Sequence, residues 1–177
     1  MEVKKVWAEE HKYHCNTCGK DFIIYRMSGF RYGEGFYLTE DGSMSVYMNN
    51  FEDEAQEEFS NLLKKFYPFR KNNQLGDEFM TIFGICCDEV KGKKIDSSRF
   101  KHTCYYCASE DIICLKEDLE NKEVVCPVVT HHMWNKLDNK TKKELIYNEL
   151  KRRKLLWKNR PGEVPGLKYY RYYLKIH

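Results

Sequence analysis

The stretch KYHCNTCGKDFII at residues 12–24 decides how this chain is interpreted, because a close copy, KHTCYYCASEDII, returns at residues 101–113. Each copy has Lys and His before a Cys-x-x-Cys, and Asp with paired Ile residues after it. A Cys-x-x-Cys on a tight turn offers two thiolates to one ion, and two such turns complete a tetrahedral four-sulfur shell. The repeated unit therefore predicts one zinc ion, with these ligands: Cys15, Cys18, Cys104 and Cys107.

A second assignment of the eight cysteines stays open at this point. The second copy could form a local site with the two cysteines that follow it, which gives the set Cys104, Cys107, Cys114 and Cys126. Cys15 and Cys18 would then recruit His11, His14, Cys86 or Cys87. Free cysteines tend to be buried, and this tendency argues against the local four-cysteine site. Core packing is the expected role of the cysteines outside the two copies.

CNTCGK and CYYCAS resemble the two knuckles of zinc-ribbon proteins, which pack two β-hairpins around a zinc ion. The resemblance covers the regions 11–24 and 101–116. It implies a structural zinc, and it departs from the family at Ala108, where ribbons usually have Gly. It also departs in the 85 residues between the knuckles, which we interpret as a domain inserted into the ribbon.

The long interval between the knuckles is energetically tolerable. The entropic cost of closing a loop rises by only about 0.6 kcal/mol per doubling of its length. Structural zinc in small peptides binds with an apparent free energy of roughly 10–16 kcal/mol. The ion would therefore join the two ends of the inserted segment.

The composition is that of an ordinary globular protein, with 42% hydrophobic and 32% charged residues and a net charge of +3. The first residues, MEVKKVWAEEHK, contain no apolar run of the signal-peptide type, and no stretch has the roughly 18 apolar residues of a membrane span. We therefore expect a cytoplasmic protein that does not engage membranes. Thiols stay reduced in the cytoplasm, so its cysteines favour metal over disulfides.

The first half of the chain predicts strands at 21–27, 36–38 and 46–48, the last two around the turn EDGS. One clear helix is expected before Pro68, because its apolar residues recur at helical spacing: Ala55, Phe59, Leu62, Leu63 and Phe66. FMTIFGICC at 79–87 is rich in β-forming residues and is predicted to be a buried strand.

In the second half, DIICLK and EVVCPVV predict paired strands around the polar loop EDLENK. A short helix capped by Thr130, a longer helix from about Thr141 to Trp157 and a terminal strand in LKYYRYYLKIH should follow. The fold class is α+β. We expect ribbon halves at 1–28 and 99–129, an inserted strand-helix-strand segment at 29–98, and a basic helix-strand region at 130–177.

The sequence offers little support for catalysis. Four thiolates leave no open coordination position for a reacting water. The pair His131-His132 could suggest an HNH nuclease, but in that family the His lies between the two Cys pairs, and here it follows both. We interpret these histidines as helix-start residues and expect a non-enzymatic protein, with nuclease activity as the third-ranked hypothesis and no small-molecule substrate inferred.

Positive charge is concentrated at the C-terminal end, where residues 151–177 contain nine Lys or Arg and one acid, Glu163. This region favours a nucleic-acid surface, in which cations bind phosphates and Tyr rings stack on unpaired bases. The candidate contacts are Arg152, Arg153, Lys154, Tyr169, Arg171, Tyr173 and Lys175. A solvated helix end followed by a half-buried strand explains the same pattern. The alternative function is a protein-interaction or inhibitory factor whose zinc is purely structural, since Tyr and Arg are common interface anchors.

Overall fold

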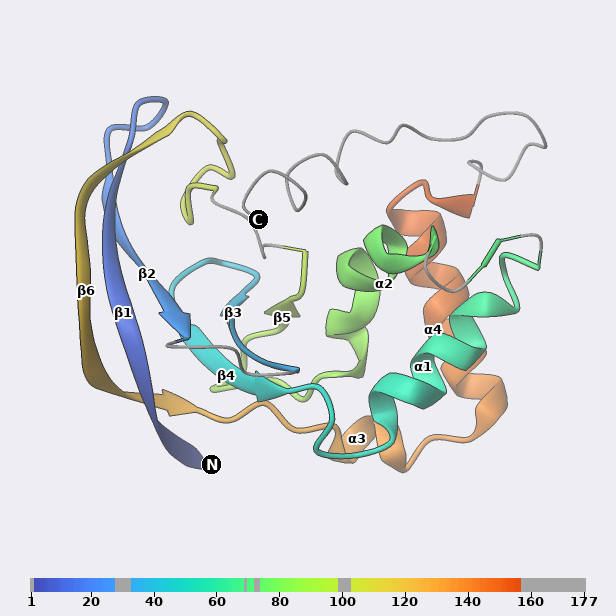
Figure 1. Ribbon diagram of the computed structural model, residues 1–177. Coiled ribbons are helices and arrows are strands. Elements are labelled where there is room, and N and C mark those ends of the chain that lie inside the picture. Colours follow the sequence, from blue (N-terminus) through green and yellow to red (C-terminus); the bar gives the residue numbers. More distant parts are fainter. Residues whose placement is uncertain (1, 28–32, 69, 72–73, 99–102, 157–177) are drawn as a thin grey trace.

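The computed structural model describes residues 2–27, 33–68, 70–71, 74–98 and 103–156. Over these residues the chain is α+β, as expected, with two three-stranded antiparallel sheets and four α-helices. The first sheet lies on one side of the molecule and the helices on the other, with the second sheet between them (Figure 1). No helix among the described residues is both long and apolar enough to cross a membrane.

The first sheet carries the two cysteine motifs at one end. Its strands are β1 (Val3–Cys15), β2 (Asp21–Met27) and β6 (Ile112–Pro127), in the order β2-β1-β6. β1 runs directly into the first Cys-x-x-Cys, and β6 begins shortly after the second. The central strand therefore brings the two motifs together, because β6 pairs with β1 as far as Cys15.

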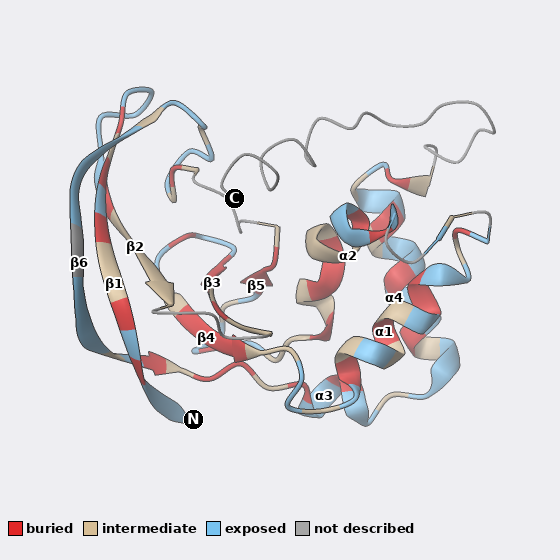
Figure 2. Ribbon diagram, in the orientation of Figure 1, coloured by how far each residue is buried: buried red, intermediate tan, exposed pale blue. Residues whose placement is uncertain are grey.

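β6 corrects one prediction from the sequence. DIICLK and EVVCPVV are not two paired strands, because both belong to this single strand and pair in sequence with β1. β1 is 13 residues long and pairs with β6 from Val3 to Cys15. One register shift in this pairing falls where the polar segment separates the two apolar runs of β6. Most of β6 is exposed at the outer edge of the sheet, as Figure 2 shows.

The buried face of β1 changes along its length. Val6 and Ala8 are buried at one end, and His11, Tyr13 and Cys15 at the other, so the parity of the buried positions switches between the two sets. A register shift with β6 falls in the same place. A bulge re-aims a strand. One end of the sheet thus packs toward β4, while the other packs on the second cysteine motif.

The second sheet matches the predicted hairpin. β3 (Glu34–Thr39) and β4 (Ser45–Asn49) pair in antiparallel register, and β5 (Ile95–Asp96) adds a short third strand beside β3. Tyr47 of β4 forms an isolated parallel bridge to Val128, just after β6. This bridge links the end of β6 to the second sheet.

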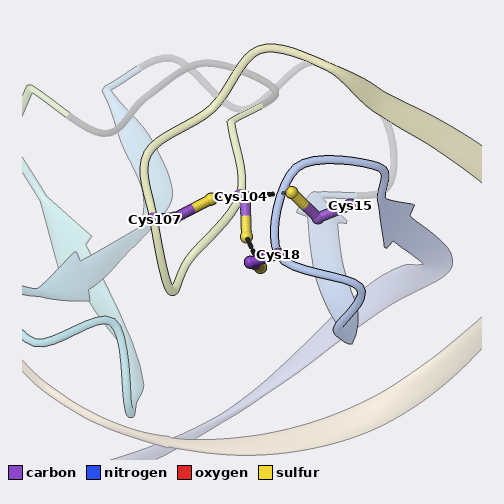
Figure 3. A group of neighbouring side chains, drawn as sticks. All are labelled: Cys15, Cys18, Cys104 and Cys107. Atoms are coloured by element: carbon purple, nitrogen blue, oxygen red, sulfur yellow. Dashed lines mark hydrogen bonds between the residues drawn. The ribbon is translucent and has the colours of Figure 1, made fainter.

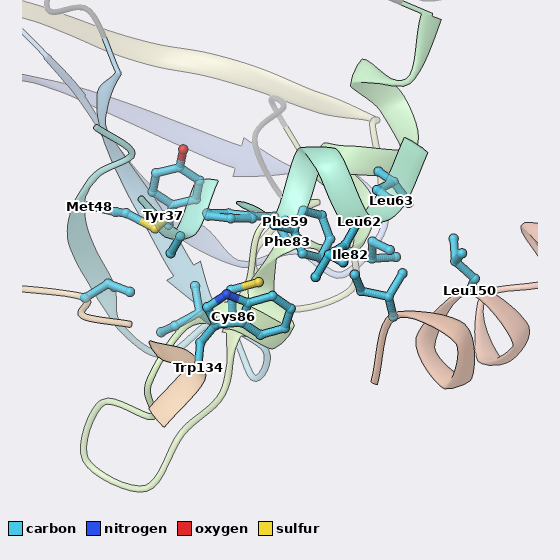
Figure 4. Close-up of a cluster of buried hydrophobic side chains, with 14 of the residues drawn as sticks. Tyr37, Met48, Phe59, Leu62, Leu63, Ile82, Phe83, Cys86, Trp134 and Leu150 are labelled. Atoms are coloured by element: carbon cyan, nitrogen blue, oxygen red, sulfur yellow. The ribbon is translucent and has the colours of Figure 1, made fainter. Parts of the chain in front are cut away.

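Four α-helices form what we call the helical body: α1 (Ala55–Lys64), α2 (Gly76–Ile82), α3 (His132–Asn135) and α4 (Asn139–Arg152). The helix predicted before Pro68 is confirmed as α1, and α4 confirms the longer C-terminal helix with an earlier end. Figure 4 shows the core, in which Phe59 of α1 lies near Phe83 and Trp134. One apolar cluster joins residues of the 29–98 segment to residues after 128.

The buried strand predicted at 79–87 is wrong, since this stretch forms the end of α2 and the 3₁₀ helix η2 (Phe83–Cys86). Phe79, Ile82, Phe83 and Cys86 follow helical spacing, and this periodicity prevails over the β-forming composition. Helical geometry places the rings of Phe79 and Phe83 against each other, with centroids 4.7 Å apart, and both contact Phe59. Tertiary packing of these rings explains the outcome.

The start of α3 also differs from the prediction. Thr130 does not cap it, because its hydroxyl donates a hydrogen bond to Asp88 at 2.6 Å. The carboxylate of Asp88 instead accepts from the backbone N–H groups of His132 and Met133, at 2.8 and 2.9 Å. Asp88, which lies 44 positions before His132 in the sequence, thus caps the start of α3.

Candidate metal centre

The first cysteine motif folds as a tight turn, which we call the first knuckle (residues 15–19). The backbone N–H of Cys15 donates to the carbonyl of Lys20 at 3.0 Å, and that of Gly19 to the carbonyl of Cys15 at 2.8 Å. Gly19 has φ of 69°, in the left-handed region that glycine adopts without strain. This conformation turns Cys15 and Cys18 toward the same side.

The second knuckle (residues 104–108) repeats the backbone of the first. Cys104 N–H donates to the carbonyl of Ser109 at 2.8 Å, and Ala108 N–H to the carbonyl of Cys104 at 2.9 Å. Ala108 has φ of 58°, so an alanine takes the left-handed conformation at the position of Gly19. Ala108 therefore departs from the glycine pattern only in its side chain, because its backbone follows the same path as that of Gly19. The strain costs roughly 1–2 kcal/mol.

The two knuckles bring their four cysteines into one group, the four-cysteine cluster (Figure 3). All four sulfurs lie within 4.8 Å of one another. Cys15 Sγ is 3.6 Å from Cys107 Sγ, and Cys18 Sγ is 3.5 Å from Cys104 Sγ. Sulfurs bound tetrahedrally to zinc at about 2.3 Å would be about 3.8 Å apart. The donor set and its spacing therefore fit a metal ion such as zinc.

The pKa values show why a cation would suit this group. Burial opposes ionisation of Cys15, but hydrogen bonds from the Cys18 backbone and the neighbouring thiols outweigh it and lower its pKa to about 6. The Ser109 backbone lowers the pKa of Cys107, but partial desolvation and the neighbouring sulfurs outweigh it and raise that pKa to about 12. One thiolate forms readily and discourages the next. A bound cation removes this conflict, because metal ligands must be deprotonated.

Polar contacts lock the knuckles to each other around the cluster. Asn16 donates to Asp111 twice, from its backbone N–H at 3.0 Å and from its side-chain amide at 2.9 Å. The hydroxyls of Thr17 and Ser109 are 2.7 Å apart. These contacts were not predicted, because the sequence shows no pattern that pairs residues of the two motifs. They hold the knuckles in fixed register.

Tyr105 is a further residue that the sequence did not identify. It lies inside the second knuckle, and its ring centroid is 4.9 Å from that of Phe22 on β2. It packs on the small buried cluster of Tyr13, Cys15, Phe22 and Cys104. The sign in the sequence that could have identified Tyr105 was the presence of an aromatic residue between the two cysteines of the second knuckle. Tyr105 ties the second knuckle to the sheet independently of the sulfurs.

The remaining cysteines do not extend the site. Over the described residues, the four-cysteine cluster is the only group of three or more Cys, His, Asp or Glu side chains with ligand spacing. Cys86 and Cys126 are buried in apolar clusters, Cys87 is half-buried beside Met48, and Cys114 is exposed on β6. The local site with Cys114 and Cys126 is therefore not formed.

The histidines considered as ligands, His11 and His14, and the pair His131-His132 have other partners. His11 is buried on β1 with Nε2 3.4 Å from Glu9, and His14 Nδ1 is 2.6 Å from Asp21. His131 is the residue before α3 and lies 3.1 Å from a carboxylate oxygen of Asp53. Its neighbour His132 opens α3, as the helix-start interpretation predicted.

Three of the predicted nucleic-acid contacts, Arg152, Arg153 and Lys154, lie in the described part of the chain. Arg152 ends α4, and Arg153 and Lys154 follow it. Both arginines bind Glu149, Arg152 through Nε at 2.7 Å and Arg153 through Nε at 2.9 Å. The other four candidates, Tyr169, Arg171, Tyr173 and Lys175, lie outside the described residues, as does the predicted terminal strand.

Comparison with known proteins adds no assignment. No protein-family model, no curated protein and no solved structure matches this chain. The geometry of the four-cysteine cluster is therefore the main basis for interpreting the site.

Proposed function

We propose that this chain is a non-enzymatic zinc protein, in which one Zn²⁺ joins a ribbon interrupted by the 29–98 segment, and that it binds nucleic acid through its basic C-terminal region. The observation that carries the zinc part is the gathering of four sulfurs from two similar knuckles. Four thiolates make a closed shell of the kind used for structural zinc. The ion would hold together segments that lie 85 residues apart in sequence.

Elemental analysis tests the zinc. The purified protein should contain about one ion per chain. Cys15→Ser and Cys104→Ser should each abolish binding, because each removes a ligand from a different knuckle. Cys114→Ser is the matched control, since Cys114 is exposed and stands outside the cluster. Full metal content in either ligand variant would refute a shared site.

The nucleic-acid part rests on charge. Lys151 and Arg152 are exposed at the end of α4, and the chain continues from there into the basic C-terminal region. The ion pairs with Glu149 occupy part of the hydrogen-bonding capacity of Arg152 and Arg153. Phosphate oxygens would have to compete with that carboxylate, so we expect moderate affinity and a strong dependence on salt.

A salt titration with single-stranded and duplex DNA and RNA tests this activity. Binding should weaken steeply as salt rises. Reversing both charges, Arg152→Glu with Arg153→Glu, should abolish it, whereas Lys140→Glu at the other end of α4 should have a small effect. Absence of binding to all four nucleic acids at low salt would refute the nucleic-acid proposal while leaving the zinc unaffected.

A protein partner is the second candidate, and one observation favours it. Val3 and Trp7 of β1 and Val125 of β6 share a face of the first sheet, and each is more than half exposed. Between them lies the surface ion pair of Lys5 with Glu123, at 2.8 Å. Exposed apolar groups gathered on one face are typical of protein interfaces. Trp7→Glu should then release a co-purifying protein without changing nucleic-acid binding.

A further inference from the structure

The four-cysteine cluster pairs each exposed cysteine with a buried one from the opposite knuckle. Cys107 is exposed, and its Sγ lies 3.6 Å from that of buried Cys15. Cys18 is exposed, and its Sγ lies 3.5 Å from that of buried Cys104. Both contacts run between the knuckles (Figure 3). Each pair therefore combines a cysteine that is accessible to solvent with one that is buried.

We propose that this cluster responds to oxidants: it binds metal when reduced, and peroxide converts it to two disulfides, Cys15–Cys107 and Cys18–Cys104. The metal-binding state rests on the function proposed above, whereas the disulfide pairing rests on the sulfur geometry alone. Susceptibility to oxidation follows thiolate character and exposure of the sulfur. All four sulfurs are thiolates while they hold the ion, so exposure decides which of them is oxidised first. Attack is thus directed to Cys18 and Cys107, with a resolving thiol beside each.

The chemistry balances with hydrogen peroxide as the oxidant. Peroxide oxidises the exposed sulfur to a sulfenic acid and is itself reduced to one water. The thiol of the facing buried cysteine then attacks that sulfur, forms the S–S bond and releases the hydroxyl as a second water. Each disulfide consumes one peroxide, and two of them leave no thiolate to hold the ion.

The crossed pairing has a structural consequence. Disulfides between the knuckles join the same two chain segments as the ion does, so β1 and β6 remain linked after metal is lost. Disulfides within each Cys-x-x-Cys would instead leave the knuckles unlinked. Oxidised metal-free protein should therefore keep the amide protection of β1 that reduced metal-free protein loses.

The test uses the full-length, zinc-loaded wild-type protein. It is treated with hydrogen peroxide, zinc release is followed with a coloured chelator, and disulfides are mapped by mass spectrometry after free thiols are alkylated. We expect release of the bound zinc together with the crossed pairs, and recovery of zinc binding after dithiothreitol. Disulfides within the knuckles, or sulfinic and sulfonic acids as the main products, would overturn the inference.

Two variants sharpen the result. Cys107→Ser should form Cys18–Cys104 and leave Cys15 reduced, whereas Cys114→Ser, an exposed cysteine outside the cluster, should give the wild-type pattern. The mapping of the wild type decides the question even if Cys107→Ser does not fold. Crossed disulfides in a protein that takes up no zinc when fully reduced would refute the metal proposal alone, and zinc binding without crossed disulfides after peroxide would refute this inference alone.

Discussion

The knuckle end of the first sheet and the helical body are held together by different means. The body has an extensive core in which Phe59 and Trp134 are fully buried and the aromatic rings contact one another. The knuckle end has a cluster of four buried residues, two of which are cysteines. Apolar burial is extensive in the body and small at the knuckle end, so we expect the knuckle end to depend on a metal ion bound by its sulfurs. The two regions should therefore respond differently to the changes below, which run from the largest expected effect on stability to the smallest.

Removing the metal should produce the largest difference between the two regions. Structural zinc supplies roughly 10–16 kcal/mol in small peptides, which is more than any single side chain contributes. Chelation under reducing conditions should expose the amides of β1 and β2 to hydrogen exchange, while α1 and α4 stay protected. Adding back Zn²⁺, but not Mg²⁺, should restore the pattern. Equal loss in both regions would show that they unfold as one unit.

Phe59→Ala should weaken the body and spare the metal centre. Phe59 is fully buried and its ring lies within 6 Å of three other aromatic rings, so truncation leaves a cavity costing about 3–5 kcal/mol. Urea unfolding followed by circular dichroism measures the loss. Phe51→Ala is the control, because Phe51 is about half exposed. Loss of zinc from the Phe59 variant would contradict the separation of the two regions.

Asp88→Asn should cost about 1–2 kcal/mol, because both carboxylate oxygens accept hydrogen bonds and an amide NH₂ in place of one of them cannot. Burial opposes ionisation of Asp88, but hydrogen bonds from Thr130 and two backbone N–H groups of α3 outweigh it and lower its pKa. A carboxylate whose pKa is lower in the folded protein stabilises the fold at pH values above its unfolded pKa of about 3.9. That stabilisation is lost as the pH falls through the folded pKa. The difference between wild type and variant should therefore shrink below about pH 4.

Thermal unfolding at several pH values measures that difference. Glu89→Gln is the matched control, because Glu89 is the exposed neighbour of Asp88. A wild-type advantage that persisted unchanged at low pH would show that the carboxylate charge is irrelevant to the cap.

The smallest effects should come from the two residues that close the knuckles. Ala108→Gly should stabilise the protein by about 1 kcal/mol, since it relieves the left-handed alanine. Gly19→Ala should destabilise it by a similar amount, through backbone strain alone, because a Cβ there meets nothing within 4 Å. Zinc affinity in competition with a chelator should shift in the same directions. If both variants changed stability or zinc affinity by the same amount in the same direction, the two positions would not be equivalent.

The sequence by itself determined the elements whose causes are local. The two Cys-x-x-Cys turns were predicted because each motif encodes its own turn, and α1 was predicted because its apolar residues keep one helical period. The hairpin of β3 and β4 was predicted because a turn signal lies between two short apolar runs. These features depend on residues a few positions apart.

Tertiary structure alone decided the features whose partners are distant. β6 is one strand and not two because β1 runs beside its whole length, and residues 79–86 are helical because the rings of Phe79 and Phe83 pack on Phe59. Asp88 caps a helix that begins 44 residues later. The physical reason is common to all three: each conformation is stabilised by contacts with distant parts of the chain, which local propensity does not encode.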